Sequence, residues 1–277
     1  MKTKYFLLMV SVVTLGLSSC QKEFDPSTYA PALNIGGFTS SKQIAATNLA
    51  AYWAFDGSLI DSVSNGAGVN TGTTFATGIK GKSLQGATDS YFLCAPSAKV
   101  LSLKSFTITE WVNTPPPSNG IIGLFSLSNK SQFWGNLEIF VENGSTNDNA
   151  TLKIVFINNG TGDKTYTASN VVNFFGKWNA LSVSYDETTS TVKVYVNGSR
   201  VSSGKLDGIT GPLNFVNSGN LVFGTTQFMT TPSQTTSHSK EPWASFLTGR
   251  LDEVKIFNKA LSDEEVGYLA KLEGRGK

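Results

Sequence analysis

The chain has 277 residues, of which 22 are Lys or Arg and 20 are Asp or Glu, so its formal net charge is only +2. This near balance excludes the strongly basic surface that nucleic-acid binding requires. Aromatic residues make up 11 % and charged residues 15 %, and with 27 glycines this composition favours strands joined by turns over helices.

The first predicted element is a signal peptide over residues 1–19. Lys2 and Lys4 supply a basic start, and Tyr5–Leu17 form an apolar core of about 13 residues, shorter than the roughly 20 of a membrane-spanning helix. The small residue before Cys20 resembles the lipobox of bacterial lipoproteins, which implies a mature chain that begins at Cys20 and is acylated there. An ordinary secretory signal cut elsewhere is the alternative.

Residues 20–47 are predicted to be the lipidated cysteine and a flexible tether. They are polar with scattered Pro, Gly, Ser and Thr, and such a stretch spans on the order of 30 Å. Gln21–Glu23 is similar to the Lys-plus-acid signal of some Gram-negative lipoproteins, so we expect an outer-membrane lipoprotein that faces the cell exterior. Cys94 would then have no disulfide partner, and we interpret it as a small buried hydrophobe.

Strand patterns become dense from residue 48 onward. Leu49–Phe55 alternates between two faces, and the paired runs Asn136–Glu142 with Thr151–Ile157 and Trp178–Tyr185 with Thr191–Val196 indicate hairpins. Further strands are predicted around Phe106–Thr109, Asn220–Phe223 and Arg250–Phe257. These patterns predict an all-β, antiparallel two-sheet sandwich in a single domain over residues 48–277.

One helix is expected near the end of this domain. Ser262 and Glu265 have the spacing of a capping box, and Val266, Leu269 and Ala270 supply an apolar stripe behind it. The prediction is therefore a β-sandwich with a short C-terminal helix.

Five motifs in order resemble the laminin-G-like jelly rolls of the concanavalin A-like lectin/glucanase superfamily. They are Tyr52–Gly57, Gly78–Leu84, Ser105–Val112, Lys177–Gly198 and Thr248–Glu265. The resemblance covers about residues 48–272 and implies a jelly-roll fold. It does not choose a function, because this fold hosts lectins, carbohydrate-binding modules, glycosidases and adhesion domains.

The sequence favours a protein without catalysis of its own. Glycosidases of this superfamily carry an E-x-D-x-x-E motif, which is absent, and related polysaccharide lyases use Arg, Tyr and His. Glu138 and Glu142 lie about 13 Å apart along a strand, too far for the roughly 5–9.5 Å of glycoside hydrolysis, so we expect them on a solvated face. His238, the single histidine, lies in a predicted loop.

The resemblance also implies a structural calcium site. Asp252 shares strand parity with Val254 and Ile256, which predicts an inward carboxylate. Several relatives bind Ca²⁺ through an Asp of the last strand of the fold, which here is the predicted strand Arg250–Phe257. Asp56 is a further candidate ligand. The alternative is that Asp252 accepts backbone N–H bonds or pairs with a basic residue. Glu110 also falls on an apolar parity, so either a bulge resets the register or it is buried with a partner.

Trp134, Tyr166 and Trp243 are the predicted carbohydrate contacts, since sugars stack on exposed aromatic rings beside polar side chains. Trp134 lies among amide side chains, Tyr166 lies in a polar segment, and Trp243 lies in Thr225–Phe246, a stretch longer than the fold needs. Simple packing is the alternative for each. Tryptophans 53, 111 and 178 lie in the family motifs and are interpreted as structural, although the parity of residue 111 would also fit the outer face of a sheet.

The expected function is therefore that of a glycan-binding, lectin-like lipoprotein of the outer membrane. Its expected partner is a polysaccharide, it touches the membrane only through its lipid, and it would serve polysaccharide utilisation within a surface glycan-uptake complex. A divergent glycoside hydrolase or lyase is one alternative. An adhesion or assembly domain that binds protein is the other.

Overall fold

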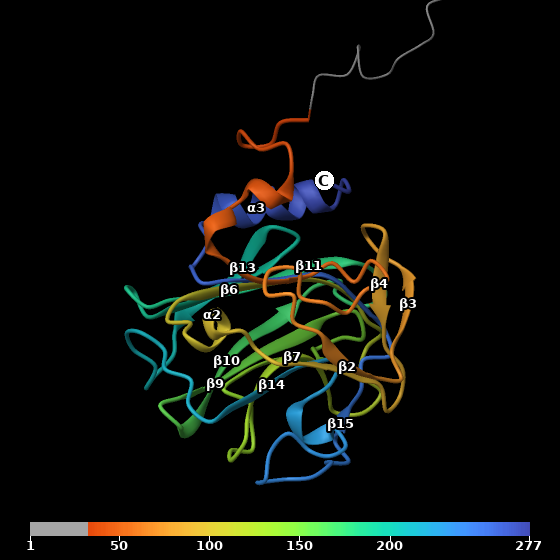
Figure 1. The fold of residues 1–277 in the computed structure, drawn as a ribbon, viewed down its shortest axis with the longest axis vertical. Helices are drawn as coiled ribbons and strands as arrows, with labels where there is room; N and C mark the ends of the chain where they lie inside the picture. The colour runs from red at the N-terminus through yellow and green to blue at the C-terminus, as the bar shows by residue number, and fades with distance from the viewer. Residues whose placement is uncertain (1–32) are drawn as a thin grey trace, which may run out of the picture. The chain divides into compact units, whose positions relative to one another are not determined.

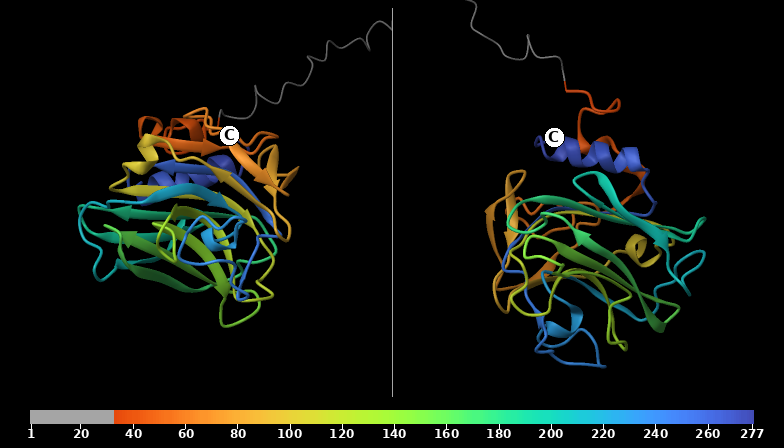
Figure 2. Two further views of the ribbon diagram at one scale, coloured as in Figure 1. Left: turned by 60° about the horizontal axis from the view of Figure 1, so that its bottom comes forward. Right: turned by 180° about the vertical axis from the view of Figure 1, so that it is seen from behind.

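The computed structural model describes residues 33–277, and one compact unit runs from Ile35 to Lys277. The predicted signal peptide, Cys20 and the first part of the predicted tether lie outside the described residues. Two eight-stranded sheets lie face to face in the compact unit (Figures 1 and 2). The predicted all-β jelly-roll sandwich with a short C-terminal helix is confirmed.

The first sheet has eight strands and includes the strand that lies within the last of the five family motifs. Its order is β13 (Ser199–Lys205), β12 (Thr191–Val196), β11 (Asn179–Asp186), β6 (Phe106–Asn113), β16 (Arg250–Phe257), β4 (Lys82–Gln85) and β3 (Thr74–Thr77), with β1 (Leu49–Trp53) also paired to β16. The interior face of this sheet carries alternating apolar residues, of which Phe106 and Ile108 of β6 are examples.

The second sheet is built around the hairpin β8–β9. Its order is β10 (Thr161–Val171), β9 (Ala150–Asn158), β8 (Leu137–Asn143), β7 (Ile121–Asn129), β14 (Ser218–Phe223), β5 (Tyr91–Cys94) and β2 (Gly68–Thr71), and β15 (Ala244–Ser245) runs parallel to β7. The outermost strands are short or irregular: β2 and β3 have four residues each, the pairing of β10 shifts register near both of its ends, and the pairing of β13 shifts register once.

The core lies between the two sheets and is rich in aromatic rings. Trp53 of β1 packs edge-on against Phe223 of β14 with ring centroids 4.9 Å apart, and Phe92 of β5 stacks on the same ring. The Trp53–Phe223 contact joins the two sheets, and the Phe92–Phe223 contact joins neighbouring strands of the second sheet. Each buried aromatic side chain contributes about 1.5–3 kcal/mol from burial. Cys94 is buried in this core, as expected.

The helix α3 (Asp263–Glu273) covers the outer face of the first sheet (Figure 1). Ser262 caps it, and the reciprocal bond from the Ser262 backbone to Glu265 completes the predicted capping box. Val266 and Leu269 are buried on its lower side. Short helical turns occur at η2 (Ser41–Gln43), η3 (Ala46–Asn48), α2 (Ala98–Leu101) and η4 (Gln227–Met229).

The compact unit starts at Ile35, within the stretch for which a tether is predicted. Phe38 packs against Tyr268 of α3, with ring centroids 6.1 Å apart, and the Ser41 N–H donates to the backbone oxygen of Lys277. Ile44 is buried. Residues 35–47 therefore pack beside α3, because Phe38, an apolar residue in this polar stretch, contacts Tyr268 of the helix.

Candidate functional site

The outer face of the second sheet carries a cluster of aromatic side chains. Alternation along β8 turns Leu137, Ile139 and Val141 into the core and Phe140 outward. Trp134 stacks on Phe140 with an interplanar angle of 10° and a centroid separation of 5.1 Å. We call Phe133, Trp134, Phe140, Phe228 and Trp243 the aromatic cluster, since each of its rings contacts at least one other.

The segment Thr225–Phe246 folds across this face and brings Trp243 to the cluster. The backbone oxygen of Trp243 accepts a hydrogen bond of 3.2 Å from Ile121, next to the parallel pairing of β15 with β7. Gly120 makes this approach feasible: it has φ +55°, and a Cβ atom there would lie 1.7 Å from the Trp243 oxygen. A long loop is thus fixed in position by a rigid strand.

Two of the three predicted sugar contacts come together. The rings of Trp134 and Trp243 are 6.1 Å apart, and Trp243 is 37 % exposed while Trp134 is half-buried. Tyr166 lies apart from them, on the interior side of β10, where its hydroxyl is 2.8 Å from Ser202 Oγ of β13. That contact links the edges of the two sheets.

Polar groups lie beside the aromatic cluster on the same face. Lys153 of β9 pairs in register with Phe140, and its ammonium is 2.9 Å from the Glu142 carboxylate. Thr165 and Thr167 of β10 lie on this face and are exposed. His238 packs edge-on against Phe133 with centroids 4.4 Å apart. Together the face offers an apolar platform with hydrogen-bonding groups around it, which suits a ligand with apolar faces and polar edges.

The expectation that Glu138 lies on a solvated face is wrong. Its side chain is fully buried beneath Thr225–Phe246, where its carboxylate accepts hydrogen bonds from the backbone of Gly135 at 2.9 Å and of Gln227 at 3.3 Å. Burial raises the pKa of Glu138 to about 8 against the opposing effect of these bonds. Alternation predicts which face a residue takes, but it does not predict the segment that covers the face.

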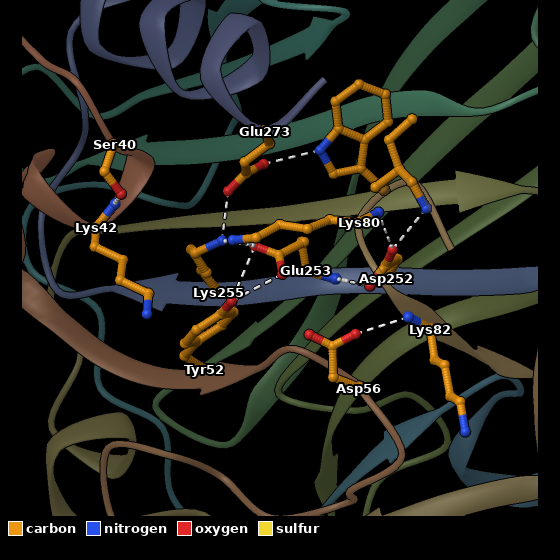
Figure 3. A network of polar contacts seen from close by, with 12 residues as sticks. Ser40, Lys42, Tyr52, Asp56, Lys80, Lys82, Asp252, Glu253, Lys255 and Glu273 are labelled. Carbon is orange, nitrogen blue, oxygen red and sulfur yellow. Dashed lines mark hydrogen bonds and ion pairs between the residues drawn. The ribbon is translucent and has the colours of Figure 1, made fainter. Parts of the chain in front are cut away.

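The carboxylates of both predicted calcium ligands accept hydrogen bonds from backbone N–H groups (Figure 3). Asp252 accepts from Ile79 at 2.8 Å, from Lys80 at 3.2 Å and from Glu253 at 2.8 Å, and Asp56 accepts from Lys82 at 2.7 Å. Within residues 33–277 no group of three or more His, Cys, Asp or Glu side chains is arranged to hold a metal. These contacts correspond to the backbone alternative for Asp252, and the calcium site stays a prediction.

A buried charge network that the sequence did not predict lies on the outer face of the first sheet (Figure 3). The Lys255 ammonium, 2 % exposed, contacts the carboxylates of Glu253 at 2.7 Å and of Glu273. Burial lowers the pKa of Lys255, but the two carboxylates outweigh this effect and the net shift is upward. Tyr52 donates to Glu253 at 2.8 Å, and Trp111 donates to Glu273 at 2.8 Å. The sequence feature that could have indicated this network is Lys255, which stands between the apolar residues Val254 and Ile256 of β16.

Glu110 is buried between Ile108 and Val112 on the interior parity of β6. Its two carboxylate oxygens have no hydrogen-bond partner among residues 33–277. Burial alone raises the pKa of Glu110 to about 8. Of the two alternatives for this residue, burial is correct, but the expected partner is absent from the described part of the chain.

The chain belongs to the concanavalin A-like lectin/glucanases superfamily, because the sequence model of its Laminin_G_3 family matches residues 85–267, more than half of the chain. No curated protein matches the sequence. Within residues 33–277, no helix is both long and apolar enough to cross a bilayer.

Solved structures share the fold at low sequence identity. The binding domain of Paraclostridial Mosquitocidal Protein 1 has a TM-score of 0.58 and 18 % identity over 82 % of this chain and 52 % of its own. The binding domain of Botulinum neurotoxin DC in complex with rat synaptotagmin II has a TM-score of 0.60 and 15 % identity over 83 % and 52 %. This chain thus spans about half the length of these toxin domains.

A third structure matches over nearly its whole length. Domain 4 of AbnA, a GH43 extracellular arabinanase from Geobacillus stearothermophilus, in complex with arabinotriose, has a TM-score of 0.54 and 21 % identity over 80 % of this chain and 98 % of its own. At these identities the three likenesses show a shared fold.

Proposed function

We propose that this chain is a glycan-binding, lectin-like lipoprotein, anchored in the outer membrane through Cys20 and facing the cell exterior. The observation that carries the proposal is the exposed Trp243 ring beside Trp134 on an outer sheet face that also bears hydrogen-bonding side chains. The fold adds support, because the similar arabinanase domain is described in complex with arabinotriose.

The proposed mechanism is capture without bond cleavage. A sugar ring would lay its C–H face on Trp243, while its hydroxyl groups exchange hydrogen bonds with Glu142, Lys153 and the threonines of β10. The Glu142–Lys153 pair holds both polar groups close to the platform at 2.9 Å. Glu138, the other acid of β8, is fully buried and touches no solvent, so it has no part in binding.

The arrangement within residues 35–277 suits a surface-anchored binder. The first residues of the compact unit pack beside α3 on the outer face of the first sheet (Figure 1). The aromatic cluster lies on the outer face of the second sheet. The chain therefore enters the compact unit on the side of α3, and the aromatic cluster lies on a different sheet face.

The proposal is tested by measuring the binding of residues 21–277 to a glycan array, with and without a chelator. We expect a polysaccharide to bind, and Trp243→Ala and Trp134→Ala to weaken that binding at least about tenfold. Tyr166→Ala tests the third predicted contact separately. Trp178→Ala is the matched control, because this half-buried tryptophan lies at the first sheet and not in the aromatic cluster. The Cζ atom of Arg250 is 5.2 Å from the centroid of its ring.

Two outcomes would contradict these assignments. If no polysaccharide binds, the glycan-binding proposal fails and a protein-binding adhesion domain takes its place. If Trp243→Ala and Trp134→Ala bind as tightly as the Trp178→Ala control, the aromatic cluster is not the site. Loss of binding in chelator would instead support the predicted calcium at Asp252 and Asp56.

A further inference from the structure

A cavity of about 470 Å³ adjoins the aromatic cluster at the rim of the sandwich. We call it the rim cavity. The loop after β6 supplies Pro115, Pro116 and Ser118, the loop before β5 supplies Thr88, and Phe246 and Thr248 follow β15. Its volume falls within the roughly 300–1,000 Å³ that is typical of small-molecule sites.

The rim cavity and the aromatic cluster share one wall. Ala244 and Phe246 line the rim cavity, and both also belong to the apolar group that contains Phe140 and Phe228 of the aromatic cluster. Trp243 immediately precedes this wall, and its backbone is fixed on Ile121. A chain molecule that stacks on Trp243 therefore needs to cross only the short segment 243–246 to reach the rim cavity.

The lining of the rim cavity combines apolar surfaces with unused hydroxyl groups. The hydroxyls of Thr88, Ser118 and Thr248 form no hydrogen bond within the part of the chain that the structure describes, and all three residues are exposed. Pro115 and Pro116 present flat apolar rings that are held by the fixed φ of proline. A pyranose or furanose ring has the matching chemistry, with C–H faces and hydroxyl edges.

The charges favour an uncharged ligand. No charged side chain of residues 33–277 lines the rim cavity. At its edge the Lys240 ammonium lies 5.3 Å from the centroid of the Phe246 ring, but it is already neutralised by the Asp89 carboxylate at 2.6 Å. An acidic sugar would therefore find no free cation here and would lose hydration without compensation.

From this arrangement we infer that the rim cavity is a second sugar subsite, and that the ligand is a neutral polysaccharide bound over several units from Trp243 to Thr88. The inference rests on the proposed glycan binding and specifies its ligand. It predicts that affinity increases with chain length, because a longer oligosaccharide that stacks on Trp243 and enters the rim cavity gains the second set of contacts without a new association step.

The test measures the affinities of neutral arabino-, manno- and gluco-oligosaccharides, as disaccharides and hexasaccharides, with oligogalacturonides as the acidic probe. Two variants alter the rim cavity: Thr88→Ala/Ser118→Ala/Thr248→Ala removes its hydroxyls, and Ser118→Trp fills it. The control is Ser199→Ala/Ser203→Ala, which removes two exposed hydroxyls from β13. All these positions are exposed, so the variants are expected to fold.

We expect a neutral hexasaccharide to bind at least about tenfold more tightly than its disaccharide, and both rim variants to abolish that gain while the control preserves it. Binding that is independent of length, a gain that survives both rim variants, or tighter binding of the acidic series would overturn the second subsite and leave glycan binding intact. If wild-type protein binds no oligosaccharide and no polysaccharide, both proposals fail.

Discussion

The outer faces of the two sheets are both covered, but by different chemistry. On the first sheet, α3 closes over a buried set of charges in which Lys255 contacts two carboxylates and Trp111 is largely buried. On the second sheet, the segment Thr225–Phe246 closes over aromatic rings and leaves Trp243 partly exposed. A face whose polar groups are satisfied internally has nothing to offer a ligand, whereas a face that leaves rings and hydroxyls unused does.

The comparison shows that the same strand parity leads to different outcomes. Trp111 and Phe140 both point away from the core, yet Trp111 donates to Glu273 of α3 whereas Phe140 stacks on Trp134 in the aromatic cluster. What covers each face depends on segments far away in sequence. The predictions below test the structural role of the first face and the free surface of the second.

The largest effect is expected from Lys255→Met, which would disrupt the buried charge network on the outer face of the first sheet. It would leave Glu253 and Glu273 buried without their cation, and we expect a loss of about 3–5 kcal/mol in the free energy of unfolding, measured by chemical denaturation. The control is Lys193→Met, since the Lys193–Asp263 pair at 3.0 Å is partly exposed to solvent and should contribute less than about 1 kcal/mol. Equal losses in the two variants would show that the buried network does not stabilise the fold.

Glu110→Gln sharpens the comparison by removing a buried acid that lacks any partner in the described chain. The unfolded chain releases this proton near its ordinary pKa of 4.5, while the folded chain keeps it to about pH 8. The folded state therefore binds more protons in between, and wild-type stability falls as pH rises through that window.

The Gln variant should lose less stability than wild type between these two pH values, by on the order of 3 kcal/mol. The measurement is a series of denaturation curves across that pH range. Glu142→Gln is the control, because its carboxylate is half-exposed and paired with Lys153. Parallel pH profiles for wild type and Glu110→Gln would contradict the buried, protonated state.

Trp111→Phe and Trp243→Ala compare the two faces directly. Trp111→Phe removes the donor to the buried Glu273 and should cost about 2 kcal/mol in unfolding free energy without affecting glycan binding. Trp243→Ala should cost about 1 kcal/mol or less and abolish most of the affinity. Denaturation and glycan binding measured on both variants check this, and the reverse pattern would exchange the roles assigned to the two faces.

The smallest effect is expected from Ser262→Ala, which removes the side-chain cap of α3. It should lower the free energy of unfolding by about 1 kcal/mol, because the hydroxyl accepts from the Glu265 backbone. Ser262→Asp is the matched variant and should retain most of the stability. If alanine and aspartate behave alike in thermal unfolding, the cap does not contribute to holding α3 on the first sheet.

Motifs with local causes were predictable from the sequence. Alternating strands, hairpins and the Ser262 capping box depend on neighbouring residues, and the structure confirms the sandwich and the helix. The approach of Trp134 to Trp243 depends on a loop that crosses the sheet, and no periodicity encodes it. Sequence reasoning could select the two residues because they lie outside the fold motifs, but it could not place them together.

The face of Asp252 was not predictable, because a bulge interrupts β16. Glu253 has φ +49°, and the pairing with β6 shifts register between Asp252 and Lys255. Leu251 and Val254 therefore both reach the core, and Asp252 does not share the face of Val254 as its parity predicted. The same bulge places Glu253 beside Lys255, which created the charge network that the sequence did not indicate.

The irregular outer strands have a consequence for crowding. An unpaired strand edge can recruit the edge of another molecule, and that risk grows when many copies are held at high local density. Here β2 and β3 are too short to template a long pairing, and β10 departs from regular register near both ends while carrying the exposed charges of Asp163 and Lys164. These features of β2, β3 and β10 limit edge-to-edge pairing between neighbouring copies of the protein.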